Sequence, residues 1–230
     1  MLSAMSTALV PPVEVVIPWR DAPTRRAPFA LVRRWYETHL PEASVRTIDT
    51  DDDVFVLAAC RNLAMRTAHP DAVVVIGDAD TLPEAEPLRA AIAAARTSGR
   101  VHLPYDEYRW LGASGSAEYA AGTLLIDCTV EQYVEGACSG VYVATPQTWF
   151  AHGGQDEAFR GWGFEDAAWY LTHQAVLGEP PRRHAGRVYA LHHAAEQRAG
   201  AGYEANEARM GLYRAAASDP GAIARLVGIS

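Results

Sequence analysis

The chain of 230 residues has few cysteines, no long apolar run and no internal repeat. Its three cysteines, Cys60, Cys128 and Cys138, show no CxxC spacing, which leaves no basis for a disulfide framework and indicates free thiols in a reducing compartment. No apolar run reaches the roughly 18 residues of a membrane span, and the N-terminal stretch lacks the basic start of a signal peptide. We therefore expect a cytoplasmic protein with no membrane partner.

Positive charge is also scarce. The 28 acidic residues outnumber the 20 basic ones and give a net charge of −8, which argues against non-specific binding to nucleic acid or to anionic membranes. Hydrophobic residues make up 49% and charged residues 21%, the balance of an ordinary globular protein. No clean linker interrupts the chain, so we expect one domain, 1–230, whose halves are residues 13–105 and 106–230.

The first half alternates apolar runs typical of buried strands with amphipathic segments typical of helices. We expect strands at 13–18, 45–48, 72–77 and 101–105, and helices at 27–40, 54–68 and 88–97. The acidic run 49–53 offers an N-cap for the second of these helices. This alternation predicts a doubly wound α/β sheet, whose ligands bind at the carboxyl ends of the strands.

The second half is less regular. Glycine, serine, alanine and aromatic residues at 106–123 predict a mobile loop, and a glycine-rich acidic loop is expected at 153–166. Thr145 and Pro146 predict a helix start after a strand. The other expected elements are strands at 138–145 and 186–191 and helices at 167–177, 205–217 and 219–227.

Two groups of residues have the chemistry of metal ligands. Asp78 and Asp80 directly follow the most apolar strand, where paired carboxylates can hold Mg²⁺ or Mn²⁺; a solvated acidic turn is the alternative. His192 and His193 end another strand. Adjacent strand residues point to opposite faces, so only one of the two can face the same crevice.

Several arginines are candidates for anion binding. Arg20 follows the first strand, where a guanidinium suits a phosphate or a uracil edge, although a surface arginine is the commoner case. Arg61 and Asn62 lie inside an apolar helical stretch, and buried polar groups need a partner. A ligand is one such partner, and an internal salt bridge to one of the acids at 49–53 is the other.

The segment Gly161-Trp162-Gly163-Phe164-Glu165-Asp166 combines a flat aromatic face with two acids at a helix start. Trp162 offers a platform for a sugar ring, and Glu165 or Asp166 can accept a proton from a hydroxyl. The alternative is helix capping by the acids with Trp162 in the core.

The order of these motifs resembles the metal-dependent GT-A glycosyltransferases. It is most similar to the β-1,4-galactosyltransferases and to the related C-terminal segment of polypeptide N-acetylgalactosaminyltransferases. The resemblance spans residues 13–215, and the Gly-Trp-Gly-x-Glu-Asp block is its most specific part. It implies a Rossmann-like, mixed central sheet flanked by helices, with nucleotide binding in residues 13–105 and acceptor binding and metal completion in residues 106–230.

The resemblance also implies roles for individual residues. The implied donor-binding residues are Pro18, Trp19, Arg20, Arg61, Asp78, Asp80, Ser139 and Gly140. The implied metal ligands are Asp80 and His193, with Asp78 and His192 as further candidates. Gly161, Trp162 and Gly163 match the acceptor loop, Asp166 the general base and Glu165 its neighbour, while Asn206, Arg209 and Tyr213 match an element that follows the metal histidine.

Four positions depart from the family pattern. Asp21 and Ala22 replace an Asn-Arg pair, so that Arg25 or Arg26 would have to supply the second nucleotide-facing arginine. Ser139 replaces the first glycine of a Gly-Gly pair. Ala190 stands where a methionine ligand is expected.

The implied activity is transfer of a sugar from a nucleotide-sugar, with UDP as the favoured nucleotide, to an acceptor hydroxyl with the help of Mn²⁺ or Mg²⁺. Asp166 as an in-line base implies inversion. The alternatives are a retaining transferase, a nucleotidyltransferase or phosphohydrolase, and a non-catalytic sugar-binding module. The acceptor is a glycan, a protein hydroxyl or a modified nucleobase. The missing membrane anchor and lectin domain suit a small bacterial or phage enzyme.

Overall fold

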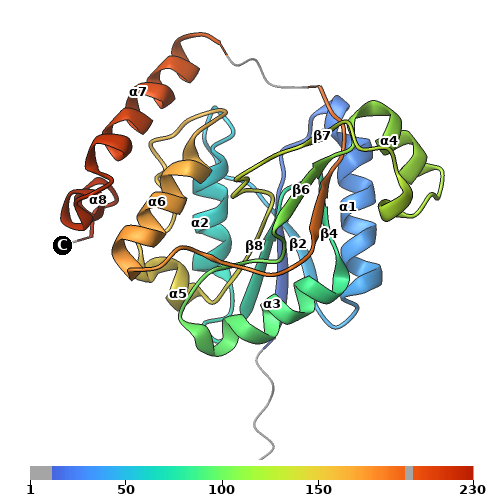
Figure 1. Cartoon of the computed structure of the whole chain (residues 1–230), viewed down its shortest axis with the longest axis horizontal. Coiled ribbons are helices and arrows are strands. Elements are labelled where there is room, and N and C mark those ends of the chain that lie inside the picture. The colour runs from blue at the N-terminus through green and yellow to red at the C-terminus, as the bar shows by residue number, and fades with distance from the viewer. Residues whose placement is uncertain (1–11, 195–198, 230) are drawn as a thin grey trace, which may run out of the picture.

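Two mixed β-sheets form the centre of the molecule in a computed structural model that describes residues 12–194 and 199–229 (Figure 1). The larger sheet has six strands in the order β2-β1-β3-β8-β5-β9, and the smaller has four in the order β4-β10-β6-β7. The larger sheet contains β1 (Val13–Pro18), β2 (Ser44–Ile48), β3 (Val73–Gly77), β5 (His102–Leu103), β8 (Val141–Ala144) and β9 (Arg182–Arg183). The smaller contains β4 (Thr81–Pro83), β6 (Glu107–Trp110), β7 (Gln132–Tyr133) and β10 (Arg187–Ala190).

The first three strands confirm the predicted parallel alternation. β1 pairs with both β2 and β3 in parallel, and every residue of β3 is buried, as expected for a strand covered on both faces. The fourth expected strand, β5, does not continue this series. Instead β8 pairs antiparallel with β3, placing Gly77 opposite Val141, and β5 pairs antiparallel with β8. The sheet is therefore mixed, which confirms the fold implied by the resemblance rather than a purely parallel sheet.

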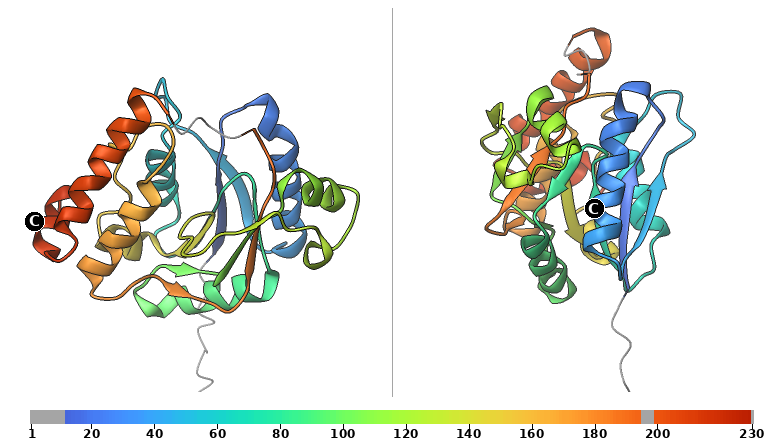
Figure 2. Two further views of the ribbon diagram at one scale, coloured as in Figure 1. Left: turned by 45° about the horizontal axis from the view of Figure 1, so that its top comes forward. Right: turned by 90° about the vertical axis from the view of Figure 1, so that its right-hand side faces the viewer.

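Helices cover both faces of the larger sheet. α1 (Arg26–His39) and α3 (Ala85–Ser98) lie on one face, where Arg89 donates to the backbone oxygen of His39. α2 (Leu57–Thr67), α5 (Pro146–Ala151) and α6 (Glu165–Leu177) lie on the other (Figure 2). α5 begins as predicted, because Thr145 Oγ1 accepts from the backbone N–H of Thr148 at 3.2 Å.

Two local predictions were wrong. The expected loop at 106–123 contains β6 and a helix, α4 (Gly112–Ala120). α2 begins at Leu57, after Val56 rather than after the acidic run 49–53, and has no side-chain cap. A short η1 helix (Pro23–Arg25) precedes α1, and a second, η2 (Leu125–Asp127), follows α4.

The C-terminal helices add a second, smaller core. α7 (Ala201–Ala216) and α8 (Pro220–Leu226) pack against α6 at the left of Figure 1. Met210, Tyr213 and Ile223 from these helices enclose Phe159 and Ala168. Within the described ranges, no helix combines the length and the apolar character that a bilayer crossing requires.

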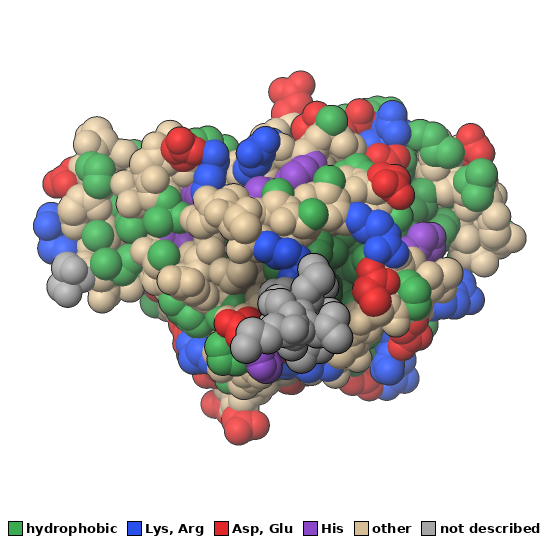
Figure 3. Space-filling model, turned by 90° about the horizontal axis from the view of Figure 1, so that it is seen from below, with side chains coloured by type: hydrophobic (Ala, Val, Ile, Leu, Met, Phe, Trp, Pro, Cys, Tyr) green, Lys and Arg blue, Asp and Glu red, His purple; other side chains and the backbone are tan. Residues whose placement is uncertain are grey.

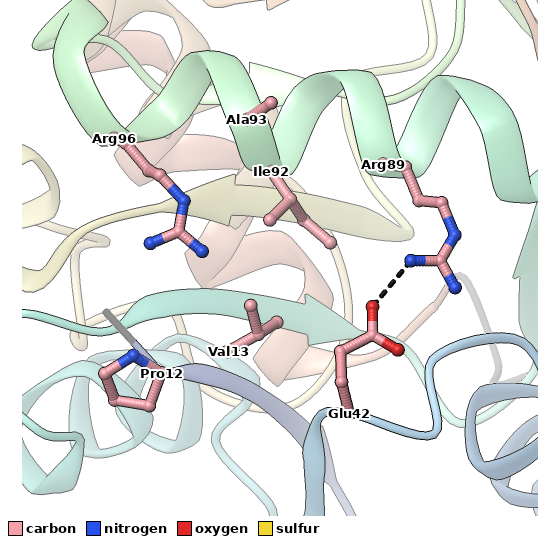
Figure 4. Close-up of a pocket in the computed structure, with 7 residues that line it drawn as sticks. All are labelled: Pro12, Val13, Glu42, Arg89, Ile92, Ala93 and Arg96. Atoms are coloured by element: carbon pink, nitrogen blue, oxygen red, sulfur yellow. Dashed lines mark hydrogen bonds and ion pairs between the residues drawn. The ribbon is translucent and has the colours of Figure 1, made fainter. Parts of the chain in front are cut away.

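The surface at the amino ends of the central strands is mixed in charge (Figure 3). All its blue groups are guanidinium groups, because the sequence contains no lysine. A hollow of about 420 Å³ at this end is lined by Pro12, Val13, Glu42, Arg89, Ile92, Ala93 and Arg96. Arg89 pairs with Glu42 at 2.6 Å inside it (Figure 4). This hollow lies at the opposite end of β1 from the carboxyl ends at which the ligand-binding residues are expected, so it is not part of the site described next.

Candidate active site

Asp78 and Asp80 follow β3 in a turn that is held from two sides. The backbone N–H of Asp78 donates to Gly140 O at 2.7 Å, just before β8. The backbone oxygen of Asp80 accepts from Leu191 N–H, also at 2.7 Å, just after β10. The two carboxylates are therefore fixed at the point where the larger and the smaller sheet meet.

Arg61 connects the acidic turn after β3, which carries Asp78, with the acidic start of α6, which carries Glu165. Its side chain is fully buried, and its Nη2 donates to both oxygens of Asp78 at 2.8 and 3.0 Å. Its Nη1 donates to Gln155 Oε1 at 3.0 Å and lies 3.6 Å from Glu165 Oε1. One of the two expected partners of Arg61 was an acid in the run 49–53. That expectation was wrong, because Arg61 pairs with Asp78 and Glu165. Among described residues, Arg61 Nε, Tyr142 Oη and Gln155 Nε2 are buried without a hydrogen-bond partner.

The buried side chain of Asn62 is also hydrogen-bonded within the protein. Its side-chain oxygen accepts from Trp149 Nε1 at 2.8 Å and from Gln155 N–H at 2.9 Å, and its Nδ2 donates to Gln155 O at 2.7 Å. Asn62 therefore fixes the segment that carries Gln155, the residue on which Arg61 depends.

Glu165 and Asp166 begin α6. The preceding Phe164 has a φ of 75°, the one non-glycine positive φ among the described residues, a conformation that costs energy and tends to occur at functional sites. Burial, followed by the charge of Asp166, raises the pKa of Glu165 to about 7, against the opposing effect of Arg61. Asp166 is half-buried, and its Oδ1 accepts from the N–H of Ala167 at 2.7 Å. The two acids thus differ in environment, one enclosed and one accessible.

Asp80 and His193 meet across the turn. Asp80 Oδ2 lies 2.7 Å from His193 Nε2, and their side chains are 22% and 17% exposed. The hydrogen bond to Asp80 raises the pKa of His193. His192 is exposed, and its backbone N–H donates to Ser116 Oγ of α4 at 2.8 Å. The structure therefore brings His193, and not the neighbouring histidine, to the aspartate.

A divalent cation suits this pair of donors. Within residues 12–194 and 199–229 there is no ready cluster of three His, Cys, Asp or Glu side chains, so the protein would supply two ligands, Asp80 and His193. Burial, followed by the charges of Asp80, Asp78 and Asp166, raises the pKa of the half-buried Tyr108, so these three carboxylates lie near one another. One carboxylate and one imidazole within this acidic surrounding fit Mn²⁺, with its remaining ligands coming from substrate and water.

Ser139 and Gly140 lie beside the carboxylates. Gly140 has a φ of +91°, and a Cβ there would lie 3.2 Å from Thr81 Cγ2 and 3.4 Å from Tyr108 Cε2. The positive φ therefore favours glycine, and the contact with Thr81 leaves little spare space for a Cβ. The sequence offered Tyr105 and Tyr108 only as aromatic residues that could stack on an acceptor, and it did not single out Gln155. The period-2 pattern of β6 would have placed Tyr108 on one face of a strand, had 106–123 not been interpreted as a loop.

Pro18, Trp19 and Arg20 lie at the end of β1 and in the turn that follows it. Arg20 donates to both oxygens of Asp49 at 2.8 and 2.9 Å, and to Thr50 O at 2.8 Å. Trp19 stacks on Phe29 of α1, with ring centroids 4.0 Å apart. Pro18 is the buried last residue of β1. These contacts give Arg20 an internal partner, so a phosphate would have to share it with Asp49.

The loop with Trp162 is held by α7. Asn206 Oδ1 accepts from the N–H of Arg160 at 3.2 Å, and its Nδ2 donates to the backbone oxygens of Arg160 and Trp162 at 2.9 and 3.2 Å. Trp162 is 41% exposed and stacks on Tyr203, with centroids 6.1 Å apart. The indole is therefore a surface platform between Gly161 and Gly163 and not a core residue.

Asp156 ties the start of the same loop to α7. It accepts from Arg209 Nε and from Tyr213 Oη, both at 2.6 Å. Asn206, Arg209 and Tyr213, which the sequence grouped together, thus all hold the loop that precedes Glu165.

No protein-family model and no curated protein sequence matches the chain. Among solved structures it is similar to the catalytic domain of Drosophila β-1,4-galactosyltransferase 7 in complex with xylobiose, at 14% identity and a TM-score of 0.56 over 86% of this chain and 80% of that one. A point mutant of the Drosophila enzyme with manganese, UDP-Gal and xylobiose matches at 13% identity and a TM-score of 0.50, over 76% of this chain and 65% of that one.

A third similar structure is GalNAc-T7 with UDP, GalNAc and Mn²⁺. It matches at 12% identity and a TM-score of 0.54, over 90% of this chain but only 50% of that one. Identities this low establish the architecture alone. The chain therefore has the GT-A fold of these glycosyltransferases.

Proposed function

We propose that this protein is a metal-dependent glycosyltransferase that moves a sugar from a nucleotide-sugar, with UDP as the nucleotide, to an acceptor hydroxyl. The observation that carries the proposal is the junction built by Arg61. This buried guanidinium links Asp78 of the Asp78-Ala79-Asp80 turn to Glu165 of the Glu165-Asp166 pair. A transferase needs its donor and its acceptor chemistry at such a fixed mutual position. The similar structures with UDP-sugars and Mn²⁺ support the same activity.

Donor binding is assigned to the carboxyl ends of the central strands. Asp80 and His193 would hold Mn²⁺, which when bound neutralises the charge of the departing diphosphate. Asp78, Ser139 and Gly140 would contact the ribose or the donor sugar. Arg20 would reach the nucleotide together with Trp19 and Pro18. Arg61 is assigned a positioning role instead of a donor contact, because it is fully buried and already engaged by protein groups.

Acceptor chemistry is assigned to the start of α6 and the loop before it. Asp166 would accept the proton of the attacking hydroxyl, since it is half-buried and only its Oδ1 is engaged by a backbone N–H among the described residues. Glu165, whose pKa is raised by burial, would orient the acceptor or the loop. Trp162, between Gly161 and Gly163, would stack on the acceptor sugar. If the acceptor hydroxyl is held by Asp166 on the side opposite the leaving diphosphate, its attack would invert the anomeric centre.

The test is release of nucleoside diphosphate from UDP- and GDP-sugars in Mn²⁺, with and without candidate acceptors. Asp80→Asn should abolish Mn²⁺-dependent UDP binding and turnover. Asp166→Asn should keep UDP binding but lower transfer by about a hundredfold, the usual scale for a general base. Asp71→Asn is the matched control. This exposed aspartate lies just before β3, at the opposite end of the strand from Asp78 and Asp80.

The proposal fails if the wild-type protein releases no nucleoside diphosphate from any of these donors. The assignment of the base alone fails if Asp166→Asn retains near-native transfer.

A further inference from the structure

The segment Ala137–Ser139, which enters the candidate site just before Gly140, is held through its backbone oxygens. Tyr105 Oη donates to Ser139 O at 2.5 Å and lies 3.4 Å from Ala137 O. Arg183 Nη2 donates to Ala137 O at 2.6 Å. Two side chains from β9 and from the segment after β5 therefore fix a turn that lacks regular secondary structure of its own.

These two side chains also support one another. The Arg183 guanidinium lies 5.6 Å from the centroid of the Tyr105 ring and 6.0 Å from that of Tyr170 on α6, within cation–π range. Tyr105 is fully buried, and burial raises its pKa well above the ordinary value. The phenol therefore stays protonated and remains a hydrogen-bond donor.

The Ala137–Ser139 segment also fixes the position of the Asp78-Ala79-Asp80 turn, through Gly140. Gly140 O, the next carbonyl along, accepts from the N–H of Asp78 at 2.7 Å and from Thr81 Oγ1 at 2.8 Å. Gly140 itself has a φ of +91°, which a residue with a side chain rarely adopts, and a Cβ there would press against Thr81 Cγ2 at 3.2 Å. A displacement of residues 137–139 would therefore move the Asp78-Ala79-Asp80 turn as well.

The turn also borders the proposed base. After burial, the charge of Asp166 is the largest cause that raises the pKa of the half-buried Cys138, and Arg183 opposes it. Residues 137–140 thus adjoin the Asp78-Ala79-Asp80 turn through Gly140 and lie near enough to Asp166 to feel its charge. In an in-line transfer the migrating sugar must lie between the departing diphosphate and the base, and residues 137–140 are near the groups assigned to both.

We propose that Tyr105 and Arg183 are positioning residues for the donor sugar, which act by fixing the backbone of residues 137–140 against the sugar ring. The inference rests on the proposed function and adds to it two residues that touch no substrate themselves. They would govern how the sugar of a nucleotide-sugar is oriented for attack, while the nucleotide remains bound by other parts of the site.

The test uses UDP and UDP-galactose with Mn²⁺. Calorimetry with UDP gives the affinity and the fraction of binding-competent protein, and the release of UDP from UDP-galactose is then expressed per UDP-binding site. For Tyr105→Phe and for Arg183→Gln we expect unchanged UDP affinity and a release rate about tenfold lower, the effect of losing one hydrogen bond. Arg183→Lys should recover part of the rate, because its ammonium can still donate to Ala137 O.

Two matched controls separate positioning from a general loss of packing. Arg182→Gln changes the exposed neighbour on β9. Tyr189→Phe removes the hydroxyl of another buried tyrosine, one that has no hydrogen-bond partner among the described residues. Both should keep the wild-type rate per site.

The outcomes distinguish the inference from the function on which it rests. A wild-type protein that binds UDP and releases it from UDP-galactose, with Tyr105→Phe and Arg183→Gln at the same rate per site, overturns the inference alone. The inference is also overturned if the variants contain less binding-competent protein but keep the wild-type release rate per UDP-binding site. Tyr105 and Arg183 would then only support folding. A wild-type protein that neither binds UDP nor releases it overturns the proposed function and the inference with it.

Discussion

Arg61 is the residue on which the candidate site depends most. It is a fully buried cation whose partners come from the turn after β3, from the loop before α6 and from α6 itself. The sequence predicted that an arginine in an apolar helix needs a partner, and it offered a ligand or a neighbour in the acidic run 49–53. Local spacing cannot tell which of several carboxylates a buried guanidinium meets, because that is decided by how the helix packs on the sheet. Here Asp49 pairs with Arg20 instead.

We predict that Arg61→Met destabilises the protein strongly, by about 3–5 kcal/mol, because it leaves Asp78 and Glu165 with buried, uncompensated charge. Arg66→Met on the same helix should cost less than about 1 kcal/mol, since an exposed ion pair contributes little. Arg66 is 47% exposed and pairs with Glu157 at 3.1 Å. Urea unfolding of the three proteins measures both values. Similar losses for the two variants would show that the buried pair has no special role in stability.

At the scale of elements, four histidines are enclosed where β5 and β9 meet α5 and α6. His102 Nδ1 lies 2.8 Å from His184 Nε2, and its Nε2 lies 2.7 Å from Ser98 Oγ. His173 Nε2 accepts from the N–H of Val101 at 3.2 Å, and His152 Nε2 accepts from Trp169 Nε1 at 2.8 Å. Each imidazole that accepts from an N–H must be neutral at that nitrogen. Burial lowers the pKa of His102 and of His173 to about 4 and that of His152 to about 3.

These histidines predict a loss of stability in mild acid. Their pKa values are lower in the folded protein than the ordinary 6.5, so the unfolded chain binds more protons between about pH 6.5 and pH 4. The free energy of unfolding should therefore fall as the pH falls through this window, by roughly 1 kcal/mol per pH unit for each histidine.

Urea unfolding between pH 7 and pH 4 measures this slope. His102→Gln should reduce the slope whatever its effect on stability at pH 7, whereas a change at the exposed His69 should leave the slope unchanged. An identical slope in His102→Gln and in the wild-type protein would contradict the explanation.

The elements that sequence patterns predicted well are the uninterrupted apolar strands, one strongly amphipathic helix and one helix that follows an acidic start. β1, β3, α1 and α6 fall within one or two residues of expectation. α4 was missed because its glycines and serines are poor helix formers. Its Gly115 is needed for a tertiary reason, since a Cβ there would lie 2.0 Å from Thr129 O. Close contact with a distant segment leaves no trace in local periodicity.

At the scale of the whole molecule, the two predicted halves share one sheet. β8, from residues 106–230, lies between β3 and β5 of residues 13–105, and β9 adds to the edge beyond them. The motifs on either half could be identified from the sequence. The antiparallel insertion of β8 next to β3, which brings Gly140 beside Asp78, could not. Strand order depends on which apolar runs pair at long range.

We therefore predict that the protein unfolds as a single cooperative unit. Far-ultraviolet circular dichroism reports on all elements, while tryptophan fluorescence reports on side-chain packing around Trp35 in the first half and around Trp149 and Trp169 in the second. The two urea transitions should coincide in midpoint and slope, as they do for two-state domains. Separate midpoints would show that the halves are independent in spite of the shared sheet.

The pairing of β3 with β8 also sets the order in which the site can form during folding. β1, β2 and β3 can assemble from neighbouring stretches of the chain, but residue 77 must meet residue 141 before Gly140 supports Asp78. Closing a loop of that length costs entropy before any contact compensates for it, and such contacts form slowly. A nascent chain that has emerged only as far as α4 therefore already holds Asp78 and Asp80, yet it lacks the strand that orders them. Competence to bind a nucleotide should arise late in synthesis, all at once, and not grow with the length of the chain.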